Sequence, residues 1–422
     1  MPKQSAEKAF EQAKERYADY GVDVENAIRQ LKKVSLSVHC WQTDDVAGFE
    51  NQDSALHGGG TAVTGNYFGK ARNLAEMRAD LEKVFSLMPG SHRLALHAIY
   101  GDFGGKSVDR DQVSPEHFAS WISWAKKNKV QLDSNSTSFS HPKSDDGFSL
   151  ASRDKKKRQF WIEQHKRSRE IAAALGQAQK TPCIHNIWIH DGDKDLTADR
   201  YGYRKILKDA LDEVFTVEYP KDRMRDALEC KLFGLGSEAY TVGSHEFYYG
   251  YALTRGKMLC YDMGHFHPTE SVADKISSAF LYFEEMLLHI SRPVRWDSDH
   301  VTIFNDDVRY LCEELVRTGK WDKAWMGLDF FDGTMNRIGA YTIGSRGVLK
   351  GMLAAFLEPL KKLREYEEKG NRFARLALME EFKTLPLGAV WDYYCESMKA
   401  PVDRDIIKNI LAYEQDVCRR RV

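Results

Sequence analysis

The 422-residue sequence predicts an α/β fold, a (β/α)8 TIM barrel with an N-terminal helix and a C-terminal helical extension. Three observations favour this class. Short runs rich in branched and aromatic residues, bounded by turn residues, recur along the chain as strands do. Several of them are apolar almost throughout, which is typical of parallel strands buried on both faces. Helical patterns separate the runs, and eight strands alternating with helices fit a closed barrel better than an open sheet.

The predicted elements follow in order along the chain. The eight strands cover residues 36–41, 94–100, 130–134, 183–189, 227–233, 258–262, 287–291 and 325–329. Predicted helices between them include residues 71–87, 115–127, 155–174, 203–214, 273–287 and 306–317. The barrel with its metal site is expected to span residues 35–340.

Segments at both ends lie outside this barrel. Residues 1–34 are predicted to form one long amphipathic helix, and residues 341–422 a helical extension. Predicted helices in the extension cover residues 348–366, 372–384, 389–398 and 403–417. A helix with an apolar stripe needs a partner for that stripe. We therefore expect the extension to pack on the outer helices of the barrel or to mediate oligomerisation.

Composition argues against several classes of protein. Lys and Arg number 61 against 62 Asp and Glu, a net charge of −1, which indicates neither a general nucleic-acid partner nor a membrane surface. The seven cysteines are scattered and contain no C-x-x-C pair. The charged N-terminal segment has no apolar core of a signal peptide, and no run reaches membrane-spanning length. We expect a cytoplasmic protein with reduced thiols.

Seven side chains that commonly bind metals lie in one quarter of the chain, most of them at or just past the end of a predicted strand. They are Glu229, Asp262, His265, His289, Asp297, Asp299 and Asp329. Polar groups delivered repeatedly from strand ends are typical of a barrel active site. The pattern therefore predicts one pocket fed by the fifth to the eighth strand.

Glu229 and Lys231 are predicted to point the same way from the fifth strand. Charged residues inside a barrel strand are hard to explain as core, because burial without partners costs several kcal/mol. Asp297 and Asp299 are separated by one residue, which in an extended segment places both carboxylates on the same side. Such carboxylates repel each other unless a cation lies between them.

Carboxylates combined with imidazoles suit Mn²⁺, Mg²⁺, Co²⁺ or Zn²⁺. The five carboxylates of the set and the Lys231 cation leave four negative charges, which two divalent ions would neutralise. Other interpretations stay open for the single elements. Asp262 could cap a helix beside a surface His265, His289 could be a satisfied core residue, and the Asp297 loop could be solvated.

Several segments together resemble the bacterial L-rhamnose isomerase family, nearly from end to end. They are VHCWQ at 38–42, LHAIY at 96–100, ECKLF at 229–233, GHFHPTE at 264–270, SRPVRWDSDH at 291–300 and GLDFFD at 327–332. The SRPVRWDSDH segment is the most specific of them. The related xylose isomerases share the Glu-x-Lys and Asp-x-Asp elements.

This resemblance implies a homotetramer that interconverts L-rhamnose and L-rhamnulose, the first step of L-rhamnose catabolism, with two Mn²⁺ ions per subunit or with Co²⁺ or Zn²⁺. It implies a structural metal bound by Glu229, Asp262, His289 and Asp329. A catalytic metal would be bound by His265, Asp297 and Asp299, with Asp262 as a bridge. His97 and Trp188 would line the sugar site, Lys231 would lie near O1, and Lys231 and Asp329 would take part in catalysis.

The reaction moves a hydrogen between C1 and C2 of the sugar, either by direct transfer or through an enediol. We favour direct transfer, because the sequence offers no obvious dedicated carbon base. The C6 methyl needs an apolar contact, for which we expect the 48–69 loop, with Ala55, Leu56, Val63 and Tyr67, as cover. The alternatives are another sugar isomerase of broad specificity, or a metal-dependent hydrolase or endonuclease barrel.

Overall fold

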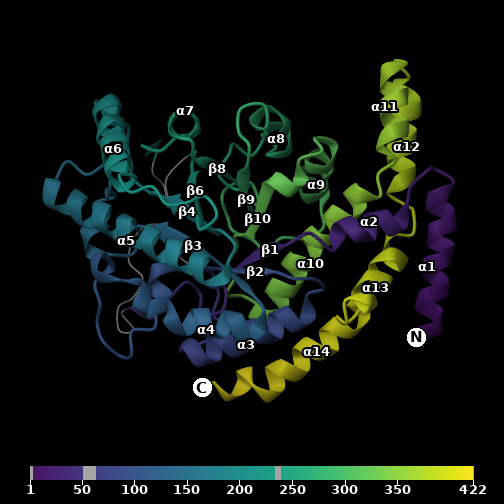
Figure 1. The fold of residues 1–422 in the computed structure, drawn as a ribbon, viewed down its shortest axis with the longest axis horizontal. Helices are drawn as coiled ribbons and strands as arrows, with labels where there is room; N and C mark the ends of the chain where they lie inside the picture. Colours follow the sequence, from purple (N-terminus) through teal and green to yellow (C-terminus); the bar gives the residue numbers. More distant parts are fainter. Residues whose placement is uncertain (1–2, 51–62, 233–238, 422) are drawn as a thin grey trace.

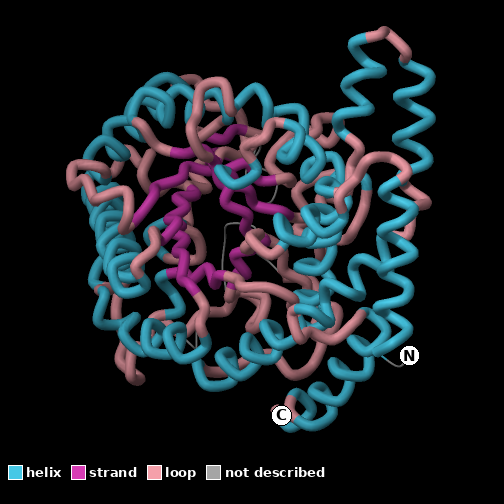
Figure 2. Tube along the Cα trace, turned by 45° about the vertical axis from the view of Figure 1, so that its right-hand side comes forward, coloured by secondary structure: helices cyan, strands magenta, loops and turns pink. Residues whose placement is uncertain are grey.

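Eight parallel strands form a closed barrel at the centre of the molecule, which confirms the predicted fold class. The computed structural model describes residues 3–50, 63–232 and 239–421. Around the barrel the strands are β1 (Leu36–His39), β10 (Ala324–Leu328), β9 (Met286–Ile290), β8 (Met258–Asp262), β6 (Met224–Glu229), β4 (Cys183–Trp188), β3 (Gln131–Thr137) and β2 (Arg93–His97). Figure 2 shows these strands as an inner ring enclosed by helices.

Helices follow the strands and cover the outside of the barrel (Figure 1). They are α3 (Leu74–Leu87), α4 (Ala119–Asn128), α5 (Lys155–Gln179), α6 (Arg200–Val214), α7 (His245–Arg255), α8 (Ala273–Ala279), α9 (Asp306–Arg317) and α10 (Arg337–Phe356). Every predicted strand overlaps one barrel strand. The short antiparallel pair β5 (Gly192–Asp193) and β7 (Tyr240–Thr241) was not expected, because strands of two residues carry no periodicity.

Two boundaries differ from the prediction at the site. The helix expected at 273–287 ends at Ala279, because β9 begins at Met286 and needs the intervening residues for the turn. The fifth barrel strand, β6, ends at Glu229, so Lys231 lies in the following loop, where its backbone N–H donates to Gly243 O at 3.2 Å.

The N-terminal segment forms two helices, where one long helix was predicted. Helix α1 (Lys3–Ala18) ends before Gly21, whose φ of +78° belongs to the left-handed region that favours glycine. Asp23 then caps α2 (Val24–Leu31), accepting a hydrogen bond from the Asn26 N–H at 2.8 Å. Helix α1 lies along the C-terminal helices, where Phe10 stacks on Tyr393 with 3.8 Å between ring centroids.

The C-terminal helices begin inside the barrel region. Helix α10 crosses the predicted boundary at residue 340 and packs against α9, so it belongs to the barrel's outer ring. The helices after it are α11 (Leu360–Glu368), α12 (Arg372–Phe382), α13 (Leu387–Ser397) and α14 (Asp403–Asp416). In Figure 1, α11 and α12 stand away from the barrel, while α13 and α14 run along it. Arg421 binds Asp80 of α3 at 2.6 Å, which fixes the end of the chain to the barrel.

An apolar layer fills the interior of the barrel beneath the ends of the central strands. Its buried members are Ile184, Ala227, Met258, Cys260 and Leu287, with Trp325 packed against them. The layer closes the barrel below Glu229 and His289, so their side chains face the cavity at the C-terminal ends of the strands. Charged groups at that level must therefore find partners among themselves or in bound ions.

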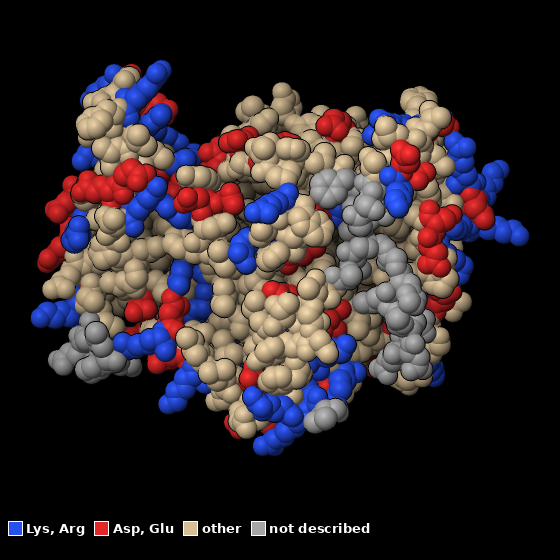
Figure 3. Space-filling view, turned by 180° about the vertical axis from the view of Figure 1, so that it is seen from behind, with Lys and Arg blue, Asp and Glu red and all other residues tan. Residues whose placement is uncertain are grey.

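The surface carries both signs of charge. Figure 3 shows Lys and Arg interspersed with Asp and Glu over the face opposite to that of Figure 1. None of the described helices is long and apolar enough to cross a membrane.

Gly176 provides a test of the packing between the outer helices and the barrel. A Cβ there would lie 1.6 Å from Arg223 O and 3.0 Å from the Cys183 backbone nitrogen, so the helix or a strand must move. We expect Gly176→Ala to lower the free energy of unfolding by at least about 1–3 kcal/mol, as overpacking does. Denaturant unfolding at a fixed protein concentration measures the change.

The matched control is Gly250→Ala in α7, where an added Cβ meets nothing within 4 Å. Alanine is favoured over glycine inside a helix by about 1 kcal/mol, so this variant should be as stable as the parent or more stable. Equal stability of the two variants would show that α5 does not contact the backbone at Arg223 as closely as described.

Candidate metal centre

Six of the seven predicted ligands line one cavity at the C-terminal ends of the strands, and the seventh, Asp262, lies among them at the end of β8. The barrel closure brings β6, β8, β9 and β10 side by side, so residues far apart in sequence meet at one rim. Asp262 on β8 pairs in register with His289 on β9, and Glu229 on β6 with Cys260 on β8. Two overlapping groups of ligands result from this arrangement.

The inner group consists of Glu229, Asp262, His289 and Asp329, whose ligand atoms all lie within 4.8 Å of one another. The His289 ring is at its centre. Its Nδ1 is 3.1 Å from Asp329 Oδ2, 3.3 Å from Glu229 Oε2 and 3.9 Å from Asp262 Oδ2. Three carboxylates around one imidazole nitrogen form a ligand set that suits a hard or borderline divalent ion.

The outer group consists of Asp262, His265 and Asp297, again within 4.8 Å of one another. His265 follows Asp262 through the turn at Gly264, whose N–H donates to Asp262 Oδ1 at 2.6 Å. The His265 Nε2 lies 3.4 Å from Asp297 Oδ2, and its Nδ1 lies 3.1 Å from Glu229 Oε1. Asp262 belongs to both groups, as the predicted bridge requires.

Asp299 lies on the wall of the same cavity but in neither of these tight groups. Its backbone has φ of +46°, an uncommon conformation for a non-glycine residue, and its carbonyl accepts a hydrogen bond from Phe331 N–H at 3.1 Å. The structure thus places six predicted ligands in the two groups and the seventh beside them.

Atoms without partners show that these residues fit cations. His265 Nδ1, His289 Nδ1 and Asp297 Oδ1 are buried, and none of the described residues forms a hydrogen bond with them. Both nitrogens nevertheless lie close to carboxylate oxygens. Buried polar atoms normally have a hydrogen-bond partner. Imidazole nitrogens and carboxylate oxygens that point toward one another can instead bind a metal ion through their lone pairs.

The raised pKa values of buried carboxyl groups also indicate that the site lacks positive charge. Burial raises the pKa of Asp262 to about 7, and the Glu229 carboxylate adds to this shift. Burial together with the neighbouring Asp297 raises the pKa of Asp299 well above its usual range. Burial lowers the pKa of His265, but the Asp262 and Asp297 carboxylates together outweigh burial, and the net shift is upward. Divalent cations at the two groups would keep these carboxylates ionised.

Lys231 is buried beside the outer group. Its ammonium donates a hydrogen bond to Asp297 Oδ2, lies 3.4 Å from His265 Nε2, and sits 5.1 Å from the centroid of the Trp188 ring. Burial lowers the pKa of Lys231, but the Asp297 and Asp299 carboxylates together outweigh burial, so the net shift is upward and the side chain is a cation.

The two residues predicted to line the sugar site both face the cavity. The His97 Nδ1 accepts a hydrogen bond from the Ile99 N–H at 3.2 Å, so its Nε2 carries the proton and donates to Thr137 Oγ1 at 2.6 Å. Burial lowers the pKa of His97, which keeps the ring neutral. The buried Trp188 Nε1–H has no partner among the described residues and is free to donate to a bound hydroxyl.

The structure does not support the alternative interpretations of Asp262, His265, His289 and the Asp297 loop. Asp262 caps no helix, since α8 begins at Ala273 after Val272, and His265 is only 7% exposed. Asp297 is 6% exposed, so its loop is not a solvated acidic loop. His289 is buried, but its Nδ1 is not satisfied as a core histidine would be.

Of the four residues expected to cover the sugar, the two that the structure describes, Val63 and Tyr67, do not line the cavity. Val63 lies against Gly333, and the Tyr67 hydroxyl donates to Glu414 Oε2 at 2.9 Å. Ala55 and Leu56 lie outside the described residues. Among the described residues, Val46, Ile99, Phe139 and Phe331 contribute apolar side chains to the lining of the cavity.

Three residues that support the ligands were missed. The Trp41 Nε1–H donates to Asp329 Oδ1 at 3.1 Å, and the Asn186 amide donates to Glu229 Oε2. Cys260 lies next to Glu229 and His289. Asn186 and Cys260 stand two residues before Trp188 and Asp262, so the alternation of strand side chains could have placed them on the inner face.

A family model and curated relatives point to the same family. The family model described as "L-rhamnose isomerase (RhaA)" matches residues 4–421. An L-rhamnose isomerase of Bacteroides thetaiotaomicron is 57% identical over 415 residues, with 98% of each chain covered. One of Rhodopirellula baltica is 54% identical over 415 residues, covering 98% of this chain and 97% of its own. A solved L-ribulose 3-epimerase is 10% identical, with a TM-score of 0.48, covering 76% of this chain and 96% of its own.

The two groups predict separable metal sites. We expect His289→Ala to lose the inner ion and His265→Ala the outer ion, each with a fall in affinity of at least about tenfold, because a ligand is removed. Metal analysis after equilibrium dialysis, followed by calorimetric titration, counts the ions that bind to each variant.

His267→Ala is the matched control. This histidine is two residues from His265 but exposed, and its Nδ1 contacts Thr269 Oγ1 at 2.7 Å. It should bind as many ions as the parent protein. Retention of every ion by His289→Ala or by His265→Ala would rule out the corresponding site.

Proposed function

The chain belongs to the L-rhamnose isomerase family, and we propose that it interconverts L-rhamnose and L-rhamnulose at two divalent ions, as the first step of L-rhamnose catabolism. The observation that carries this proposal is the pair of ligand groups that share Asp262 on the rim of one cavity. A sugar isomerase must hold two neighbouring oxygens of its substrate while a hydrogen moves between C1 and C2. The cavity is lined by polar and charged side chains together with aromatic ones, a lining that suits a small polar ligand such as a monosaccharide.

We propose Mn²⁺ as the ion at both groups, with Co²⁺ or Zn²⁺ as substitutes. Glu229, Asp262, His289 and Asp329 would hold the inner ion. His265, Asp297, Asp299 and the bridging Asp262 would hold the outer one. When bound, such ions hold sugar oxygens and stabilise the negative charge that develops on them. This assignment is supported by the orphaned nitrogens of His265 and His289 and by the oxygen-rich ligand set.

Two neighbouring residues beside the outer group, Lys231 and Trp188, are proposed to act on the sugar. Lys231 would present its ammonium to O1 and so stabilise charge on that oxygen, a role supported by its cationic state and its contact with Asp297. Trp188 would donate its free Nε1–H to a hydroxyl. His97 would offer its neutral ring as a wall, because both of its nitrogens are already engaged.

Asp329 is proposed to have two roles, as an inner ligand and as a catalytic carboxylate. Its Oδ2 is 3.1 Å from His289 Nδ1, while its Oδ1 accepts a hydrogen bond from Trp41. The side chain is 19% exposed, more than those of the other inner ligands. That exposure supports contact with the cavity and with the hydroxyl protons of a bound sugar.

An apolar wall is proposed to select a 6-deoxy sugar. Val46, Ile99 and Phe139 line the cavity from the loops after β1, β2 and β3, opposite the charged residues. A sugar whose C1 and C2 lie at the ligand groups would direct its far end to this wall. A methyl group at C6 gains by burial there, whereas a hydroxymethyl group would lose hydrogen bonds to water.

The proposal predicts that the protein forms a ketose from L-rhamnose when Mn²⁺ is supplied. A chelator that removes the Mn²⁺ should abolish this activity. We expect kcat/KM for L-rhamnose to exceed that for L-mannose, which carries a hydroxymethyl group at C6, by about tenfold or more, since a buried unpaired hydroxyl costs about 1–3 kcal/mol. His265→Ala should abolish turnover while leaving the fold intact. Ketose assays under matched conditions measure both substrates.

Several outcomes would contradict the proposal. An absence of L-rhamnulose would remove the assigned substrate, and equal use of both sugars would favour an isomerase of broad specificity. Hydrolysis of a phosphodiester would favour the nuclease alternative. L-Rhamnose deuterated at C2 tests the transfer itself: retention of the label supports direct transfer between carbons, and washout into water supports an enediol.

We propose that the chain assembles as a homotetramer through its helical extension. Large apolar side chains are exposed there: Phe373 at 82% and Leu376 at 59% on α12, and Ile407 at 70% and Leu411 at 53% on α14. Large exposed apolar patches on soluble proteins are often interfaces. Light scattering of the intact chain should give four times the chain mass, and Phe373→Ser should shift the population to smaller species. A monomeric parent protein would contradict the assembly.

A cytoplasmic location is also proposed. It is supported by seven free and buried cysteines, which suit a reducing compartment. Fractionation of the source cells would contradict it by finding the protein outside the cytoplasm.

A further inference from the structure

A thiol lies in the floor of the cavity, at the border between the inner ligand group and the apolar layer. Cys260 stands two residues before Asp262 on β8, so both side chains are on the inner face of the strand. It is paired in register with Glu229 on β6 and is 1% exposed. Its position therefore combines an apolar neighbourhood below with two metal-binding side chains above.

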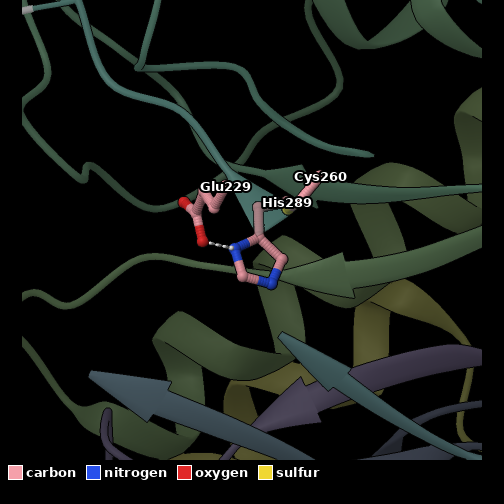
Figure 4. A group of neighbouring side chains, drawn as sticks. All are labelled: Glu229, Cys260 and His289. Atoms are coloured by element: carbon pink, nitrogen blue, oxygen red, sulfur yellow. Dashed lines mark ion pairs between the residues drawn. The ribbon is translucent and has the colours of Figure 1, made fainter. Parts of the chain in front are cut away.

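Glu229, Cys260 and His289 form a third group of ligands, whose atoms lie within 4.8 Å of one another. Figure 4 shows the three side chains next to one another, with a dashed line for the ion pair between Glu229 and His289. The His289 Nδ1 is 3.3 Å from Glu229 Oε2, and none of the described residues forms a hydrogen bond with it. His289 is 5% exposed, so this unpaired atom is held inside the group.

The third group differs from the inner group in its chemistry. The inner group adds two carboxylates to Glu229 and His289, whereas the third group adds a sulfur. Oxygen-rich sets suit Mn²⁺ and Mg²⁺, but a thiolate selects softer ions. One thiolate and one carboxylate also neutralise a divalent ion, which favours its burial next to Ile184, Ala227 and Leu287.

We propose that Glu229, Cys260 and His289 form an alternative site for a thiophilic divalent ion such as Cd²⁺ or Zn²⁺. Binding requires the Cys260 thiol to release its proton to the solvent, leaving a thiolate ligand. Because Glu229 and His289 are common to both groups, an ion held by the thiolate excludes the inner ion of the proposed isomerase. The inference rests on that proposed inner site and makes it the point at which thiophilic ions inhibit the enzyme.

The test uses Cd²⁺ and the metal-stripped full-length chain. We expect one Cd²⁺ per chain to give a sulfur-to-metal charge-transfer band in the ultraviolet and a cadmium NMR signal in the range of thiolate ligation. Cys260→Ser should abolish both signals and lower the Cd²⁺ affinity at this site by at least about tenfold. Excess Mn²⁺ should displace the band in the parent protein, because the two groups share ligands.

Two cysteine variants serve as controls. Cys312→Ser removes an equally buried thiol from α9, and Cys230→Ser removes the thiol whose Sγ lies 3.7 Å from His245 Nδ1, a competing thiol–imidazole pair. Both should keep the Cd²⁺ signals. Circular dichroism tests whether each variant is folded. The displacement of Cd²⁺ by Mn²⁺ is measured on the parent protein, so it does not depend on the folding of a variant.

Binding of Cd²⁺ without a charge-transfer band would overturn the inference. So would a band that persists in Cys260→Ser or is lost in Cys230→Ser. A band that excess Mn²⁺ leaves unchanged would also overturn it. Ketose formation with Mn²⁺, measured on the same preparation, separates this result from the proposed function. A chain that isomerises L-rhamnose without showing the band retains its function and lacks the thiolate site.

Discussion

The whole centre depends on one carboxylate that contacts two imidazoles. Glu229 places Oε1 3.1 Å from His265 Nδ1 and Oε2 3.3 Å from His289 Nδ1, so it joins the outer group to the inner one. At 3% exposure, its charge would cost several kcal/mol without partners. Burial opposes its ionisation, but His289 and His265 outweigh burial and hold the pKa of Glu229 below its usual range. The remaining ligands are arranged around this fixed anion.

The closed barrel makes that arrangement rigid. Register pairing of β6 with β8 and of β8 with β9 sets the heights of Glu229, Asp262 and His289 relative to one another. The apolar layer below prevents their side chains from turning toward the interior. Asn186 and Trp41 then fix the carboxylates of Glu229 and Asp329 from the neighbouring strand ends. A site on strands needs little reorganisation to receive ions, because its geometry is set by backbone hydrogen bonds.

Much of this centre could be predicted from the sequence, because strand ends in a barrel converge whatever the details of packing. Asp262, His265 and Asp297 come together as expected. Supporting residues such as Asn186 and Cys260 were missed because a small polar residue in an apolar strand looks like ordinary core. The pairing of Lys231 with Asp297 joins residues 66 positions apart, and only the closed barrel sets that distance. The break between α1 and α2 depended on the backbone of Gly21, which periodicity does not reveal.

The charged residues of the cavity and most of its aliphatic and aromatic residues come from different strands of the barrel. Strands β6 to β10 and their loops supply the charged residues, from Glu229 to Asp329, while the loops after β1, β2 and β3 supply Val46, Ile99 and Phe139. A ligand that contacts both sets of residues must carry polar oxygens at one end and an apolar group at the other. The 6-deoxy sugar of the proposed reaction has this asymmetry, so in that proposal it would be oriented by the same strand order that assembles the ligands. Recognition and metal binding thus follow from one topological feature.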